Sequence, residues 1–137
     1  MKKFYDKLVK TRHHLHQHPE LSGQEYETTS FLSRYLQDLG IKILDSGLET
    51  GLIAEIGQGE PVIALRADID ALPILEQTGL PYASQNPGVM HACGHDFHQT
   101  SLLGAAELLK AMEEDLQGTI RLIFQPAEET SQGASQV

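Results

Sequence analysis

The sequence predicts an α/β fold with a mixed sheet flanked by helices, and three observations lead to this prediction. Apolar residues recur at helical spacing in long segments near both ends of the chain. Between these segments lie short runs rich in Val, Ile and Leu, bounded by Gly or Pro, as in buried strands. The length of 137 residues fits one domain with a sizeable core.

The composition excludes several classes of function. A formal net charge of −9 argues against nucleic-acid binding, because phosphates require clustered Lys and Arg. No apolar run reaches membrane-spanning length, and the basic start leads into no apolar segment, so we expect no membrane partner and no secretory signal. The single cysteine allows no internal disulfide and suits a reducing cytoplasm, so we expect a cytoplasmic protein.

The first helix is expected over residues 4–17, where Phe4, Leu8 and Leu15 fall on one face. It stops there because Pro19 disfavours helix in the residue before it. Among its His residues, His14 and His18 have the spacing of a helical metal site. We interpret the His cluster instead as capping and solvating the helix end, since Pro19 disrupts that spacing.

The second helix is expected to start at Ser22–Glu25, which matches a capping box, and to run to Leu39, with Gly40 as its C-terminal cap. A third helix is expected from Phe97, with an apolar face that suits a helix lying on a sheet. Asp96 occupies the position of its N-cap. Residues 72–88, rich in Pro, Gly, Asn and Gln, are expected to form a surface loop.

Short strands are expected between and after these helices, at residues 41–44, 52–56, 62–65 and 119–124. The unbroken apolar run of residues 62–65 predicts a strand buried on both faces. It is followed by Asp68 and Asp70, and the last strand is followed by Glu128 and Glu129. The carboxyl ends of strands are where open α/β sheets gather their ligands. A turn-forming role for the two Asp residues is equally consistent with the sequence.

The ten-residue segment 89–98, around Cys93, has the highest density of potential metal-binding side chains, with three His, one Cys and one Asp. Cys93 and His95 are two residues apart and can reach one metal ion or a close pair of ions. Of the adjacent Glu128 and Glu129, one can bind the metal while the other accepts a proton from metal-activated water. We therefore predict a metal-dependent hydrolase site.

Two alternatives stay open at this point. Cys93 could be a nucleophile with His95 or His91 as its base, although a base two residues away rarely has the required geometry. The chain could also be a non-catalytic metal-binding or structural module. The carboxylate of Glu128 discriminates between the readings, because a structural metal site has no use for a free carboxylate beside the ion.

The sequence contains, in this order, LHQHPEL at residues 15–21, RADIDALP at 66–73, MHACGHD at 90–96 and FQPAEE at 124–129. Together these motifs closely resemble the aminoacylase and carboxypeptidase family of two-metal peptidases. The resemblance is closest to its amidohydrolase branch, which includes hippurate-hydrolase-like and N-acetyl-diaminopimelate deacetylase-like enzymes. It covers essentially the whole chain.

The resemblance implies a zinc-peptidase-like α/β catalytic domain that holds two divalent ions, with Zn, Mn, Co or Ni compatible with the ligands. Carried over motif by motif, Cys93, His95 and Glu129 would be metal ligands, with Cys93 bridging the ions, and Glu128 would be the general base. The residues expected to support them are Asp68, Asp70, His91 and Asp96.

The implied activity is hydrolysis of the amide bond of small N-acyl amino acids or similar conjugates. Two further His ligands of the family have no counterpart, because no His follows His98. We therefore expect residues 1–137 to be the N-terminal part of the catalytic domain, without the dimerisation domain and the rest of the catalytic domain. The complete protein is expected to be a homodimer, and the chain alone to bind metal weakly and to be inactive.

Overall fold

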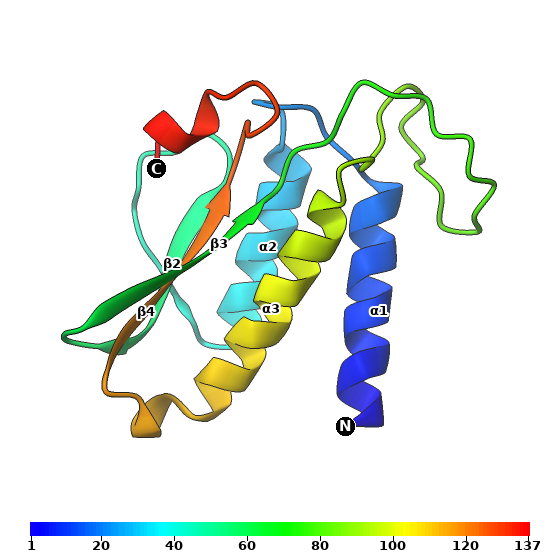
Figure 1. The fold of residues 1–137 in the computed structure, drawn as a ribbon. Helices are drawn as coiled ribbons and strands as arrows, with labels where there is room; N and C mark the ends of the chain where they lie inside the picture. The colour runs from blue at the N-terminus through cyan, green and yellow to red at the C-terminus, as the bar shows by residue number, and fades with distance from the viewer.

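A computed structural model describes all residues from 1 to 137 and shows three helices on one side of a mixed four-stranded sheet (Figure 1). The helices are α1 (Lys2–Gln17), α2 (Tyr26–Asp38) and α3 (His95–Ala111). Helices α2 and α3 lie on the sheet, while α1 packs along the outer side of α3. The predicted α/β architecture is confirmed. None of these helices combines the length and hydropathy that crossing a membrane requires.

The sheet has the strand order β1-β2-β4-β3. Its strands are β1 (Lys42–Ile43), β2 (Leu52–Gln58), β3 (Val62–Asp68) and β4 (Gly118–Gln125). Strand β2 runs antiparallel to both β1 and β4, whereas β3 runs parallel to β4, with Asp68 opposite Gln125. Because the parallel strands β3 and β4 end at the same rim, the residues that follow them are brought together there.

The core lies between the helical layer and one face of the sheet. Alternate residues of β2 are buried, as expected for a strand covered on one side. They pack with β4 and with the inward faces of α2 and α3, through side chains such as Leu32, Leu36, Leu103, Leu122 and Phe124. Short connections of chain, including η1 (Glu113–Asp115) and η2 (Gly133–Ser135), complete the fold.

Strand β3 is less buried than its sequence predicts. It lies at the edge of the sheet with β4 as its single neighbour, so Val62 and Ile63 are exposed, the latter by 55%. The prediction that residues 62–65 are buried on both faces is therefore wrong for this chain. The apolar run reflects hydrophobicity, which does not distinguish a central strand from an edge strand.

The capping box predicted at the start of the second helix is also absent. Ser22 Oγ donates to Asp70 Oδ2 at 2.6 Å, and the Glu25 side chain turns into the core. The first turn of α2 is capped instead by the carboxyl group of Glu20, which accepts the backbone N–H of Thr28 at 2.7 Å. Both side chains of the motif therefore bind residues that are distant in the sequence instead of capping α2.

Two expectations about α1 and α3 need correction. Asp96 is not an N-cap, because α3 begins at His95 after the left-handed Gly94, and the Asp96 side chain accepts hydrogen bonds from His16 and Arg12. His16 itself is buried rather than solvated. His18, by contrast, caps the end of α1 as expected, with Nδ1 2.7 Å from the carbonyl oxygen of His14.

Residues 72–88 form the predicted loop, with no helix or strand. The loop is fastened to α1 at several points. The ring of Tyr82 stacks on that of His13 at 3.8 Å, and Glu76 Oε1 lies 3.2 Å from His16 Nε2. The loop therefore returns the chain to the rim of the sheet, where the Cys93 segment begins.

Candidate metal centre

Three segments meet at the rim where β3 and β4 end. They are residues 68–70 at the end of β3, residues 93–95 at the start of α3, and residues 127–129 after β4. The parallel pairing of β3 with β4 brings the first and third segments together, and the crossover through α3 places the second beside them. The sequence motifs that looked separate therefore form one site.

Cys93, His95 and Glu129 form a compact group of potential metal ligands. The thiol sulfur, one imidazole nitrogen and one carboxyl oxygen all lie within 4.8 Å of one another. Thiolate, imidazole and carboxylate are the ligand types that zinc and related divalent ions take in proteins. Glu129 Oε1 is buried without a hydrogen-bond partner, which is unfavourable unless a cation or a donor satisfies it. The residues present therefore fit a divalent metal ion.

Asp70 sets the orientation of the His95 ring. His95 Nδ1 lies 2.9 Å from the backbone carbonyl oxygen of Asp70 and 3.2 Å from its carboxyl Oδ1. Since a carbonyl oxygen can only accept, Nδ1 carries the proton and donates. Nε2 is then left free to bind a metal, the arrangement by which neighbouring oxygens commonly fix metal-binding His residues.

Asp70 is itself buried, and two donors reach its carboxyl Oδ2, whereas its Oδ1 makes no hydrogen bond. Its Oδ2 accepts Ser22 Oγ at 2.6 Å and the backbone N–H of Glu129 at 2.9 Å. Burial raises the pKa of Asp70, but the neighbouring His95 imidazole and the hydrogen bonds from Ser22 and Glu129 outweigh it and lower that pKa to about 2. Asp70 thus contacts both segments that carry the candidate ligands, His95 through its backbone carbonyl oxygen and Glu129 through its carboxylate.

The surroundings of two candidate ligands raise their pKa values. Burial lowers the pKa of His95, but the hydrogen bonds and charge of Asp70 outweigh it, so that the pKa is raised overall. The neighbouring carboxylate of Glu129 raises the pKa of the Cys93 thiol, and burial and the charges of nearby carboxylates add to this effect. A metal ion binding here must displace the thiol proton of Cys93 and any second proton that His95 carries on Nε2. A raised thiol pKa also argues against Cys93 as a nucleophile.

Glu128 lies at the open edge of the group. Its carboxyl Oε2 is 3.9 Å from His95 Nε2, the same distance as Glu129 Oε1, and its side chain is 39% exposed. The chain turns sharply at Ala127, which has a φ of 50°, and this turn directs both carboxylates to one site. The prediction that a turn after Pro126 brings the two Glu residues together is confirmed.

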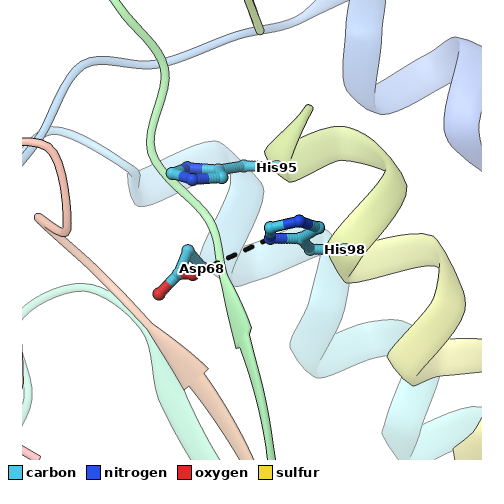
Figure 2. Close-up of side chains that lie close together, drawn as sticks. All are labelled: Asp68, His95 and His98. Carbon is cyan, nitrogen blue, oxygen red and sulfur yellow. Dashed lines mark ion pairs between the residues drawn. The ribbon is translucent and has the colours of Figure 1, made fainter. Parts of the chain in front are cut away.

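A second group of potential ligands shares His95. Figure 2 shows Asp68 at the end of β3 facing His95 and His98 on the first turn of α3, with Asp68 Oδ2 3.7 Å from His98 Nδ1. The Asp68 carboxylate also pairs with Arg66 at 2.5 Å, and the His98 side chain is 47% exposed. Because His95 has one free nitrogen, it can serve only one group at a time. We favour the Cys93 group, whose carboxylate has no competing cation.

His98 was not singled out as a site residue by the sequence analysis. The signal was available, since His95 and His98 are three residues apart and therefore share a face once the segment is helical. The other two supporting residues lie deeper. Asp96 is fully buried, and His91 is buried with both ring nitrogens unpartnered, so that burial lowers the pKa of His91 to about 4.

Comparison with protein families gives a match over residues 64–137 to peptidase family M20/M25/M40. An N-acetyl-L-cysteine deacetylase of Bacillus subtilis is 60% identical over 132 residues, which cover 95% of this chain and 32% of that protein. An IAA-amino acid hydrolase of Arabidopsis thaliana is 47% identical over 135 residues, covering 98% of this chain and 31% of that protein. The chain thus spans about a third of the length of the curated relatives it matches.

Among solved structures, the YXEP protein of Bacillus subtilis is described as a dinuclear metal binding peptidase from the M20 family. It superimposes on the whole of this chain with a TM-score of 0.97 and 56% sequence identity, over 39% of its own length. A crystal structure of a relative that is described as metal-binding therefore has the same arrangement of helices and strands around the rim.

Proposed function

The chain belongs to peptidase family M20/M25/M40, and from this premise we propose that the whole protein is a metal-dependent amidohydrolase of small N-acyl amino acids or similar conjugates. One observation carries the proposal: Cys93, His95 and Glu129 converge within 4.8 Å, with the carboxylate of Glu128 beside them. The names of the relatives support the substrate class, since one is a deacetylase of an N-acetyl amino acid and another a hydrolase of an amino-acid conjugate.

Cys93, His95 and Glu129 would hold the metal, and two divalent ions are proposed for the complete site, with Zn, Mn, Co or Ni compatible with these ligands. When bound, such ions lower the pKa of water and polarise a carbonyl group. Asp70 keeps His95 in the tautomer whose Nε2 is free. The description of the Bacillus subtilis structure as dinuclear supports the number of ions.

Glu128 is proposed as the general base. Its carboxylate lies next to the ligand group but is partly open to solvent, so it can reach both water and substrate. It would take a proton from the attacking water and deliver it to the nitrogen of the leaving amine. A site that only stabilised the fold would not need this free carboxylate, so its position favours catalysis over the structural alternative.

The remaining proposals concern the whole protein. We propose a cytoplasmic homodimer, on the basis of the single cysteine and of the family resemblance. The 137-residue chain alone is proposed to bind metal weakly and to hydrolyse little substrate, because three ligands supply only part of the shell of two ions. Residues beyond this chain would complete the site.

The test compares the wild-type whole protein with its Glu128→Gln variant, using N-acetyl amino acids as substrates and measuring metal content on the same samples. We expect kcat to fall by roughly 10²- to 10⁴-fold while the metal content stays unchanged. Full turnover in Glu128→Gln would refute the assignment of the base. Metal binding without any hydrolysis by the wild-type protein would favour the non-catalytic alternative.

A further inference from the structure

Glu25 is a fully buried carboxyl group outside the ligand set. It is the N-cap residue of α2, yet its side chain makes no capping hydrogen bond and is 0% exposed. Its Oε1 instead accepts the backbone N–H of Ala127, 102 positions away, at 2.8 Å. Its Oε2 has no partner. A buried carboxyl group with an unpartnered oxygen is unfavourable for the fold, so its presence calls for a role that an apolar residue could not fill.

The residue that Glu25 holds is in an unusual conformation. Ala127 has a φ of 50°, in the left-handed region that side chains with a Cβ atom disfavour. This conformation reverses the chain after Pro126, so that Glu128 and Glu129 approach His95 together. The N–H of Ala127 points inward, and without Glu25 it would be a buried donor with no acceptor.

The turn is held from its other side as well. Asp70 Oδ2 accepts the backbone N–H of Glu129 at 2.9 Å, and the carbonyl oxygen of Ala127 accepts the N–H of Gly133 at 3.1 Å. Gly133 lies so close that an added Cβ would be 1.6 Å from the carbonyl oxygen of Pro126. Among these contacts, the hydrogen bond from the Ala127 N–H to Glu25 is the one that joins the strained residue to a side chain at the start of α2.

We propose that Glu25 is a positioning residue, which fixes the turn that presents Glu128 and Glu129 by accepting the Ala127 N–H. This inference rests on the proposed function of that turn as base and metal ligand. Glu25 touches neither substrate nor metal in this account. It acts through the backbone, and its effect therefore depends on an acceptor atom at Oε1 rather than on a carboxylate as such.

The first test measures the turn directly, without metal. Amide hydrogen exchange of Ala127 is followed by NMR in the 137-residue chain, relative to the amide of Leu122 in the same sample. Glu25→Gln keeps an acceptor oxygen, so we expect protection within about threefold of wild type. Glu25→Met has a similar length but no such acceptor, so we expect protection to fall at least about tenfold. Equal protection in a folded Glu25→Met variant would overturn the proposal.

The second test measures the metal site. Co²⁺ is titrated into the same chain, and the charge-transfer absorption between the Cys93 thiolate and cobalt is recorded. We expect Glu25→Met to weaken affinity by about tenfold or more, and Glu25→Gln to stay near wild type. Leu36→Ala is the matched control, since Leu36 is buried on the same helix and belongs to the apolar core. It should lower Tm but leave cobalt affinity unchanged.

The outcomes distinguish a failure of the proposed metal site from a failure of the proposed role of Glu25. Absence of cobalt binding by wild type would count against the metal site, while the exchange of the Ala127 amide would still decide the role of Glu25. Loss of affinity in Leu36→Ala equal to that in Glu25→Met would reduce Glu25 to a structural residue. If Glu25→Met does not fold, the variants are compared in the Ala127→Gly background. Glycine adopts a positive φ without the steric cost of a Cβ atom, so the turn is less strained there.

Discussion

The carboxyl Oδ2 of Asp70 accepts the backbone N–H of Glu129 at 2.9 Å, and so ties the end of β3 to the turn that follows β4. The carbonyl oxygen of the same Asp70 accepts the Nδ1 proton of His95. One buried residue thus sets the positions of two proposed metal ligands that come from different elements. A change at Asp70 should be felt in both the stability of the fold and the geometry of the site.

Asp70→Asn is predicted to change how stability depends on pH. The pKa of Asp70 is lowered from 3.8 to about 2, so the native carboxylate contributes stability that is present above pH 4. This stability, about 2 kcal/mol, is lost as pH falls from about 4 to about 2. Denaturant unfolding at several pH values should therefore show wild type and Asp70→Asn differing most near neutrality and converging in acid.

The control for this prediction is Asp45→Asn, because Asp45 is exposed on the chain between β1 and β2. Its removal should leave the pH profile of stability unchanged. A constant difference between wild type and Asp70→Asn at every pH would contradict the attribution to the Asp70 carboxylate.

His98→Asn is predicted to leave the affinity for the first metal ion nearly unchanged, within about threefold, because Asp68 already pairs with Arg66 and His98 is about half exposed. Cys93→Ser should lower that affinity by at least about tenfold, since it removes a thiolate ligand. Isothermal titration with Zn²⁺ distinguishes the two ligand groups that share His95. A larger loss in His98→Asn than in Cys93→Ser would place the ion in the Asp68 group instead.

Gly51→Ala is predicted to be more destabilising than Gly47→Ala. Both glycines have positive φ, so each substitution should cost about 1 kcal/mol from backbone strain. A Cβ at Gly51 would also lie 2.6 Å from both the carbonyl oxygen of Phe124 and Cδ of Pro126, whereas a Cβ at Gly47 meets nothing within 4 Å. Overpacking should add roughly 1–3 kcal/mol, measured by denaturant unfolding. Equal losses of stability in the two variants would show that the chain at Pro126 moves aside for the added Cβ at no cost in stability.

His16→Leu is predicted to destabilise the chain by about 1–3 kcal/mol, because it removes a donor from the fully buried Asp96. Arg12 would then be the remaining donor to that carboxylate. His13→Leu, which loses only a stacking contact with Tyr82, is the matched control and should cost less than about 1 kcal/mol. Thermal unfolding of both variants tests this, and a larger loss in His13→Leu would contradict it.

Local periodicity was sufficient to predict the helices, because the apolar faces of α2 and α3 recur along the sequence itself. The rim was also predictable, since acidic residues follow two strands whose carboxyl ends can converge in an α/β sheet, although the parallel pairing of β3 with β4 is known only from the structure. The edge position of β3 was not, because the apolar run of residues 62–65 reads the same in a central strand.

The contact that Glu25 makes could not be predicted from its local sequence. Its spacing from Ser22 is that of a capping box, yet Ser22 donates to Asp70 and Glu25 accepts from Ala127. Both contacts span large distances in sequence, and nothing in the local pattern distinguishes them from a cap. The fold decided between local and distant partners by burying Glu25 beneath the turn at the rim and by placing Asp70 within hydrogen-bond reach of Ser22.

The most direct measurement of the central claim is the metal content of the 137-residue chain after equilibrium dialysis against Zn²⁺, for wild type, Cys93→Ser, Glu129→Gln and Glu128→Gln. We predict that wild type and Glu128→Gln bind zinc alike, whereas Cys93→Ser and Glu129→Gln bind at least about tenfold more weakly. Zinc binding that is the same in all four proteins would contradict the claim that Cys93, His95 and Glu129 form the metal site.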